Sequence, residues 1–271
     1  MSQPDSATFP QRNPSHDVRH AVQRHAPDRA AGSSPRPGLR AWLAALAYLP
    51  ALAAAVPPAG TTTLVYELSR SGLALAQMTD TLRVEGGAYR LVSDAQGVGL
   101  VALIARGQTI RRESRGTIVG HGLQPKNFVE QRGNNYRLAA DFDWPAGSVV
   151  LTDAKGEVSR ESVAAQAQDR LTMPYQLAFA RGTPPESFSV QVADGRHVTD
   201  YAFRLVGTET VATGLGEVRA LHYTKVLSGN DTAFDFWLGL DQYLLPVRVS
   251  YADKDGARFE QSLRSYHPAR L

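Results

Sequence analysis

Large apolar and polar side chains alternate along most of the chain after Gly60. In the run TLVYELS, for example, Leu64, Tyr66 and Leu68 share one parity. A period of two places such side chains on one face of a β-strand. Similar short runs follow one another almost to the C-terminus. The pattern predicts a mostly β fold in which consecutive strands pair antiparallel to one another.

Clusters of Gly, Asn and Asp separate these runs and mark the turns. Gly86 and Gly87 are adjacent and readily supply the positive φ angles of a two-residue hairpin turn. The other segments predicted as turns are RGNN (132–135), ADGR (193–196), TGLGEV (213–218) and DKDG (253–256). Two of these segments partly match the sequence of a ligand-binding loop. TGLGEV lacks the third glycine and the following helix of a nucleotide loop, and DKDG lacks the later ligands of a calcium loop.

One stretch departs from the period of two. In AQDRLTMPYQLAFARG, apolar residues recur at helical spacing, with Asp169 placed as an N-cap and Gly182 as a stop. The recurring positions are Leu171, Tyr175, Ala178 and Phe179. We therefore expect one short amphipathic helix, packed across a strongly curved antiparallel sheet that resembles a half-open barrel. A second helical turn is a weaker prediction at 99–106.

The first 55 residues differ in composition from the rest. Residues 1–38 are rich in Pro, Ser, Arg and His without apolar periodicity, which predicts a disordered leader. Residues 39–55 place a basic residue before an apolar run that ends in small residues, as in a signal peptide. We expect export to the periplasm, and the alternative is an inner-membrane anchor with the protein facing the periplasm. Residues 60–271 are predicted to form a single β-rich domain.

Composition and charge exclude several functional classes. The 271 residues contain no cysteine, so disulfides, thiolate metal sites and cysteine nucleophiles are absent. The formal net charge of +3 is carried entirely by residues 1–55, where six arginines face three aspartates, so the remaining chain is balanced. A balanced domain without a basic stripe is a poor match for nucleic acid.

No set of residues indicates catalysis, a cofactor or a metal. Asp141 and Asp143 share a strand face, but solvent exposure at a strand end is the simpler interpretation. The four histidines of the domain lack metal-ligand spacing, and the serines lack a nucleophile elbow. A charged segment that contains Arg111, Arg112 and Arg115 with Glu113 is interpreted as solvated surface or a sheet edge, with an anion site as the alternative.

Aromatic residues occur in nearly every predicted strand. They can fill a packed core or line a cavity that holds an apolar guest, and the pattern is the same in both cases. The C-terminal hairpin illustrates this, since Val247, Val249 and Tyr251 alternate with polar residues and Phe259 returns on the partner strand.

The same hairpin carries a family resemblance. Its elements are Trp237-Leu238, Asp241, Leu245-Pro246-Val247, Lys254, Gly256 and Leu263. Together they resemble the closing signature of the bacterial family known as domain of unknown function 3108, whose members are exported envelope proteins. Asp169 and Leu171 resemble that family's central D-x-L-S element, with Thr172 in place of serine. The resemblance spans about 62–267. It implies a fold similar to the LolA/LolB-like lipoprotein carriers, and it implies no catalytic residues.

Two functions are therefore carried forward. The first is a non-catalytic periplasmic protein that binds or shields a lipid or acyl chain. The residues expected to form its cavity wall are Tyr175, Phe179, Trp237, Val247, Val249, Tyr251 and Phe259. The alternative is an envelope scaffold or protein-interaction module with a filled core, whose protein partner binds along an exposed strand edge.

Overall fold

The computed structural model describes residues 56–104, 109–229, 231–253 and 255–270. These residues belong to one compact unit, Leu49–Leu271. The predicted leader (1–38) and the predicted signal segment or anchor (39–55) lie outside the described residues. Among the helices in the described ranges, none has the length and apolar character needed to cross a bilayer.

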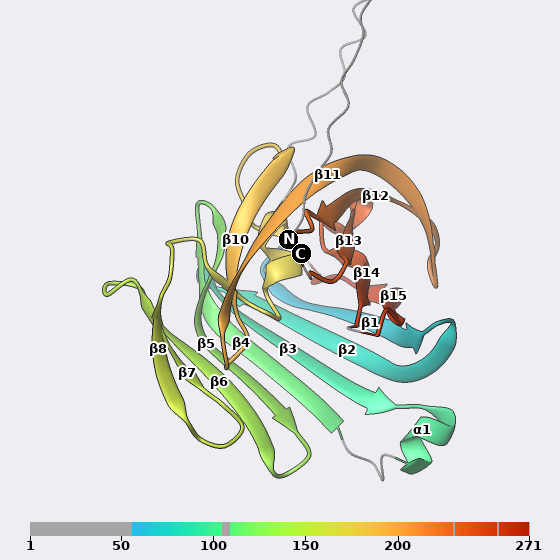
Figure 1. The fold of residues 1–271 in the computed structure, drawn as a ribbon. Helices are drawn as coiled ribbons and strands as arrows, with labels where there is room; N and C mark the ends of the chain where they lie inside the picture. Colours follow the sequence, from blue (N-terminus) through green and yellow to red (C-terminus); the bar gives the residue numbers. More distant parts are fainter. Residues whose placement is uncertain (1–55, 105–108, 230, 254, 271) are drawn as a thin grey trace, which may run out of the picture. The chain divides into compact units, whose positions relative to one another are not determined.

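A single curved, open sheet of fifteen strands forms the fold (Figure 1). The first half of the sheet, from its edge inwards, contains β8 (Val158–Ser162), β7 (Ser148–Thr152), β6 (Tyr136–Asp143), β5 (Gly122–Arg132), β4 (Thr109–Val119), β3 (Ala88–Gly97), β2 (Leu73–Glu85) and β1 (Gly60–Arg70). The second half continues outwards with β15 (Arg258–His267), β14 (Pro246–Ala252), β13 (Phe234–Gly239), β12 (Gly216–Lys225), β11 (Val198–Thr213), β10 (Ser187–Ala193) and β9 (Gln168–Asp169).

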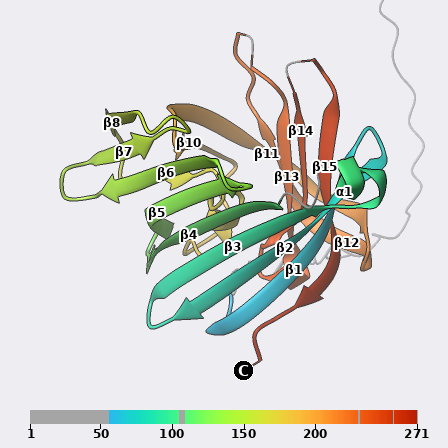
Figure 2. The same cartoon turned by 90° about the horizontal axis from the view of Figure 1, so that it is seen from below.

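Each half is a meander of antiparallel neighbours, which confirms the strand prediction. The predicted turns after Glu85, Arg132, Ala193, Thr213 and Ala252 all connect paired strands. Two pairings depart from the meander. β1 pairs antiparallel with β15, and the two-residue strand β9 pairs parallel with β10. In Figure 2 the two halves diverge from the β1–β15 pair and run in different directions, which shows how strongly the sheet is curved.

The sheet curls until its β9 end meets β4 and β5, although the strands of the described residues form an open sheet with β8 and β9 at its edges. The Gln168 side-chain amide donates to the Leu123 carbonyl over 2.7 Å, and Ser114 donates to the Asp169 carboxylate. Gly195, in the β10–β11 turn, approaches β6 so closely that a Cβ there would lie 2.7 Å from the Leu138 Cβ. Side-chain contacts and close packing thus bring the ends of the open sheet together.

The predicted amphipathic helix is wrong in type. The segment forms only a short 3₁₀-helix, η1 (Met173–Ala178), which lies inside the curve of the sheet in Figure 1. Asp169 does not cap it, because its carboxylate accepts the Leu171 and Thr172 amides and makes a separate turn first. Five of the six residues of η1 are buried, so the segment has no exposed face. A short stretch enclosed on all sides favours the tighter 3₁₀ turn over an amphipathic α-helix.

Two further helical elements are short. The structure confirms a helical turn in the region predicted at 99–106, as α1 (Gly99–Ile104). A 3₁₀ turn, η2 (Leu240–Gln242), joins β13 to β14. The apolar core lies on the inner face of the sheet around η1. Its largest fully buried side chains are Tyr66, Tyr175, Tyr223, Phe128, Phe179, Phe203 and Phe236.

Candidate ligand-binding site

A cavity of about 440 Å³ lies on the inner face of the sheet. Strands from both halves of the sheet and the segment around η1 contribute to it. Its lining residues are Leu68, Met78, Asp80, Ala95, Ile110, Arg112, Arg132, Arg170, Leu171, Pro174, Phe234, Pro246, Val249, Tyr251, Phe259 and Gln261. The lining is therefore mostly apolar, with a cluster of charged side chains.

The apolar wall is built on the C-terminal hairpin. Tyr251 and Phe259 are directly opposite each other across β14 and β15, and their rings stack with centroids 5.1 Å apart. Val249 lies two residues before Tyr251 on the same face, and Phe234 pairs with Tyr251 from β13. Aromatic cross-strand pairs of this kind stiffen a sheet face, so this part of the wall is preformed.

Three arginines converge on Glu130, whose side chain is completely buried. Arg112 Nε donates to Glu130 Oε2 over 2.5 Å, and Arg132 Nε donates to Oε1 over 2.7 Å. The Arg170 guanidinium lies 3.6 Å from Oε2, within ion-pair distance. We call Arg112, Arg132 and Arg170 the arginine cluster. All three line the cavity, and Glu130 lies behind them.

The arginine cluster keeps Glu130 ionised despite its burial. Burial alone would raise the pKa of this carboxyl, but the charges of Arg112 and Arg170 and the hydrogen bond from Arg112 outweigh it and lower the pKa. Burial lowers the pKa of the Arg170 guanidinium, and repulsion from Arg112 adds to this. The cluster is thus an arrangement of like charges held together by one buried carboxylate.

Asp80 lies at the cavity next to a pair of tyrosines. The Tyr175 hydroxyl donates to Asp80 Oδ2 over 2.6 Å, and the Tyr66 hydroxyl donates to the Pro246 carbonyl over 2.7 Å. Burial raises the pKa of Asp80, while hydrogen bonds from Ser93, directly opposite on β3, and from Tyr175 act to lower it. Asp80 is therefore a buried carboxyl whose polar neighbours belong to the protein itself.

Asp169 ties the segment before η1 to the sheet. Its Oδ1 accepts the amides of Leu171 and Thr172 at 2.8 and 2.9 Å, and its Oδ2 accepts the Ser114 hydroxyl. Burial raises the pKa of this carboxyl to about 6, against these hydrogen bonds. Asp169 therefore fixes the segment that leads into η1 and places Arg170 beside the cavity.

Three of the seven residues predicted for the wall line the cavity: Val249, Tyr251 and Phe259. Tyr175 lies in the core and reaches the site only through its hydrogen bond to Asp80. Phe179 and Val247 are fully buried in the core away from the lining. The structure thus brings the C-terminal hairpin residues together but not the remaining four.

Trp237 requires a correction, because it lies on the opposite face of the sheet. It is directly opposite Arg248 in register, and the Arg248 guanidinium lies 5.0 Å from its ring centroid. The indole stacks on His222 with ring centroids 4.2 Å apart, and its N–H donates to Glu209 over 2.9 Å. Phe236, its neighbour in the sequence, points inwards instead, as the alternation of a strand requires.

The arginine cluster is the feature that sequence reasoning missed. Arg112 was grouped with Arg111 and Arg115 as surface or a sheet edge, but β4 is an interior strand between β3 and β5. Arg112 lies two residues from both Ile110 and Ser114 on β4, and these two side chains face inwards. The alternation of the strand therefore indicates that Arg112 also faces inwards. Arg132 likewise has the parity of Phe128 and Glu130 on β5. Arg170 follows the two-residue strand β9, which is too short to show an alternation.

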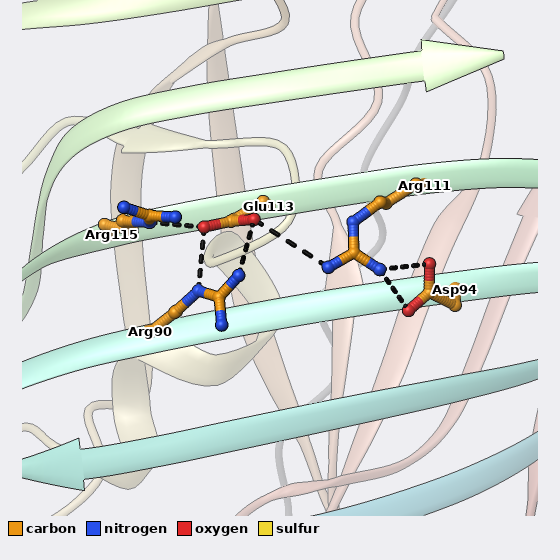
Figure 3. Close-up of polar contacts among 5 residues, drawn as sticks. All are labelled: Arg90, Asp94, Arg111, Glu113 and Arg115. Atoms are coloured by element: carbon orange, nitrogen blue, oxygen red, sulfur yellow. Dashed lines mark hydrogen bonds and ion pairs between the residues drawn. The ribbon is translucent and has the colours of Figure 1, made fainter.

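Arg111 and Arg115 form a separate network on the outer face (Figure 3). Arg90 donates two hydrogen bonds to Glu113, at 2.8 and 3.0 Å, and Arg111 binds both oxygens of Asp94. The hydrogen bond from Arg90 makes the largest contribution to a pKa of about 2 for Glu113. These pairs alternate in sign along β3 and β4, so the surface interpretation holds for this face.

The other residues considered for catalysis or metal binding are not grouped into a site. Asp141 and Asp143 are exposed on β6, as interpreted from the sequence. Within the residues that the structure describes, no three His, Asp or Glu side chains are grouped so that they could hold a metal ion. The cavity and its arginine cluster are therefore the site with the most distinctive chemistry.

The solved structures that are similar to this chain include two whose overall similarity is weak. One is a candidate lipoprotein from Parabacteroides distasonis, 11% identical, with a TM-score of 0.36 over 78% of this chain and 97% of that one. The other is a candidate exported protein with a YmcC-like fold from Bacteroides fragilis, 10% identical, with a TM-score of 0.35 over 79% and 99%. No curated protein matches the chain. A family model described as "Protein of unknown function (DUF3108)" matches residues 65–263, most of the described domain, and the chain therefore belongs to that family.

Proposed function

We propose that this protein is a non-catalytic, exported protein that binds an apolar ligand, such as the acyl chain of a lipid, in the cavity on the inner face of its sheet. The observation that carries the proposal is the cavity of about 440 Å³, lined on one side by the stacked Tyr251 and Phe259. Sites for small ligands have volumes of about 300–1,000 Å³.

The energetics favour an apolar occupant. Removal of apolar surface from water contributes about 25 cal/mol per Å², so an acyl chain in contact with the wall gains affinity in proportion to its buried length. The wall is built from strands that pair on both sides, and little order is lost when a ligand binds to a preformed surface.

Export is part of the proposal and rests on the sequence. Residues 39–55 have the layout of a signal peptide, and we expect the domain to be located in the periplasm. The resemblance described from the sequence implies a fold similar to lipoprotein carriers, and on that expectation we propose a role in shielding acyl chains there. No acid, base and nucleophile set was identified in the sequence, which supports a binding role over catalysis.

A scaffold function is the second candidate, and one observation favours it. β8 is the edge strand of the sheet, and Val158 at its start is 68% exposed. A partner strand could add to this edge. The strand is only five residues long and carries Arg160 and Glu161, features that protect edges from pairing. The cavity therefore gives the stronger case.

The test is native mass spectrometry of the protein purified from a periplasmic extract, followed by solvent extraction and lipid analysis. We expect a stoichiometric amphiphile that is released on denaturation. The ligand-free protein should take up dodecanol, and the substitution Ala95→Phe, which fills the cavity, should abolish this uptake while the protein remains folded by circular dichroism. A protein that carries no ligand and takes up no dodecanol would exclude the binding function and leave the scaffold.

A further inference from the structure

One part of the cavity lining is positively charged and another part is apolar, and this division indicates the class of ligand. We propose that the ligand is an anionic amphiphile, whose acyl chain lies along the apolar wall and whose phosphate or carboxylate group binds the guanidinium groups of Arg112 and Arg170. This inference rests on the binding function proposed above and specifies the headgroup.

The first argument is charge. The arginine cluster carries three positive charges, and Glu130, which lies behind it, supplies one negative charge. Asp80 is the acidic side chain in the lining, whereas Asp194 acts on Arg170 from outside it. Even with Asp80 and Glu130 both ionised, the three arginines at the cavity exceed these two negative charges by one. The site therefore keeps an excess of positive charge in a domain whose overall charge is balanced. An anionic group would neutralise that excess where the charges are partly removed from water.

The second argument is the supply of hydrogen-bond donors. Arg132 holds Glu130 with two of its nitrogens. Arg112 binds Glu130 through Nε, and its terminal nitrogens donate to no other described residue. The Arg170 guanidinium makes no hydrogen bond within the described part of the chain, although it lies within ion-pair distance of Glu130. Two guanidinium groups therefore keep donors with the planar geometry that suits phosphate and carboxylate.

The third argument is that the arginine cluster, Tyr251 and Phe259 line one and the same cavity. The positive charges of Arg112, Arg170 and Arg132 act to lower the pKa of Tyr251, against the larger effect of its burial. The Tyr251 ring at the same time stacks on Phe259 in the apolar wall. Tyr251 is therefore affected by the charges of the arginines and is also part of the apolar wall. A ligand that extends from the arginines along this wall must be polar at one end and apolar at the other.

The size of the cavity limits the apolar part of the ligand. The volume of about 440 Å³ lies near the lower end of the range of about 300–1,000 Å³ for ligand sites, which favours one acyl chain over two.

The experiment compares probes with the same chain and different headgroups. Dissociation constants of dodecyl phosphate, dodecanol and dodecyltrimethylammonium are measured below their micelle concentrations by calorimetry, with inorganic phosphate as a fourth probe. We expect dodecyl phosphate to bind about 10-fold or more tightly than dodecanol, as charge-assisted hydrogen bonds imply. Dodecyltrimethylammonium should bind more weakly than dodecanol, and inorganic phosphate alone should bind weakly or not at all.

Two variants assign the headgroup contacts. Arg112→Gln and Arg170→Gln should each lower the affinity for dodecyl phosphate about 10-fold and leave the affinity for dodecanol unchanged. Arg111→Gln is the matched control, because this neighbour of Arg112 lies on the outer face (Figure 3) and should change neither affinity. Dodecanol binding also reports whether each variant remains folded.

The outcomes separate the two proposals. Equal binding of dodecyl phosphate and dodecanol would overturn the anionic headgroup and leave the apolar-ligand function in place. Binding of inorganic phosphate as tight as that of dodecyl phosphate would overturn the amphiphile and indicate a site for free anions. If neither dodecanol nor dodecyl phosphate binds, the proposed function itself fails. These comparisons use the unsubstituted protein, so they hold even if a variant does not fold.

Discussion

The Tyr175 hydroxyl donates a hydrogen bond to Asp80 Oδ2 over 2.6 Å and thereby ties η1 to β2 across the inner face of the sheet. Both side chains are buried, and the same hydroxyl lies 3.3 Å from that of Tyr66. Because η1 is a single short 3₁₀ segment, contacts of this kind hold it in place rather than hydrogen bonds of its own.

Removal of that hydroxyl should destabilise the protein. Tyr175→Phe leaves the buried Asp80 Oδ2 without its hydrogen-bond donor, and we expect a loss of about 1–3 kcal/mol in the free energy of unfolding. Tyr266→Phe is a matched control, since the Tyr266 hydroxyl is buried but has no described partner, and its removal should cost little. Urea unfolding followed by circular dichroism measures both variants. Equal stability of the two would show that the Tyr175–Asp80 bond contributes nothing.

Asp169 should make stability depend on pH. Its pKa rises from 3.8 in the unfolded chain to about 6 in the folded protein, so the folded state binds the proton more tightly. This contribution to stability is complete below about pH 4 and is lost as the pH rises through about 6. Its size is about 3 kcal/mol, from about 1.4 kcal/mol per pKa unit.

The variant Asp169→Asn isolates this effect, because Asn does not titrate and its Oδ1 can still accept the Leu171 and Thr172 amides. The difference in unfolding free energy between the unsubstituted protein and the variant should change between pH 4 and pH 7, in favour of the variant at the higher pH. Glu113 and Glu130, whose pKa values are lowered, have the opposite sign but are common to both proteins. A constant difference across this range would contradict the assignment.

Glu130 should contribute far more to stability than Glu113. Glu130→Gln removes the carboxylate that holds three guanidinium groups together on the inner face, and we expect a loss of about 3 kcal/mol or more at pH 7. Glu113→Gln removes a partly exposed carboxylate from the outer network in Figure 3 and should cost less than about 1 kcal/mol. Thermal unfolding at two salt concentrations would compare them. Similar losses would mean that burial of Glu130 is not decisive.

Gly195 should be sensitive to substitution because of its position against β6. Its φ of +89° already disfavours any other residue, and a Cβ would lie 2.7 Å from the Leu138 Cβ. Gly195→Ala should therefore cost about 3 kcal/mol, from backbone strain and overpacking together. Gly182→Ala separates the two causes, since Gly182 has a φ of +97° with no neighbouring atom within 4 Å and should cost only about 1 kcal/mol. Unfolding midpoints in urea would give both values.

The two faces of the C-terminal hairpin region should respond differently to loss of an aromatic side chain. Phe259→Ala removes part of the cavity wall and should weaken dodecanol binding about 10-fold. Trp237→Phe alters the outer face and should leave dodecanol binding unchanged, although the hydrogen bond to Glu209 is lost. Isothermal titration with dodecanol measures both. A strong effect of Trp237→Phe on binding would place the ligand elsewhere.

Much of the fold could be predicted because a period of two is a local signal. The alternation around Leu64 and the turn at Gly86 and Gly87 each identify their element from a few neighbouring residues. The segment from Leu171 to Phe179 could not be assigned correctly. Its spacing matches an α-helix, but enclosure by both halves of the sheet decides its form, and that enclosure depends on residues distant in the sequence.

The candidate site was predictable only in part, for a related reason. Val249, Tyr251 and Phe259 alternate on adjacent strands of one hairpin, so the sequence places them on one face. Arg112, Arg132 and Arg170 come from three separate elements, and only the curl of the sheet brings them together at Glu130. Trp237 is one of the predicted wall residues, but its position opposite Arg248 in the register of β13 and β14 places it on the other face.

The pairing of β1 with β15 at the centre of the sheet has a consequence for how the chain folds. Each meander pairs strands that are neighbours along the chain, so it can form soon after its own residues are available. The β1–β15 pairing joins Thr63 to His267, near the end of the chain, and can form only when that end is present. Until then β1 and β14 each present an unpaired edge in the middle of the future sheet. A chain that crosses a membrane from its N-terminus therefore completes its fold only after the last strand has emerged. Truncation before β15 leaves two half-sheets with unpaired, aggregation-prone edges rather than a smaller domain.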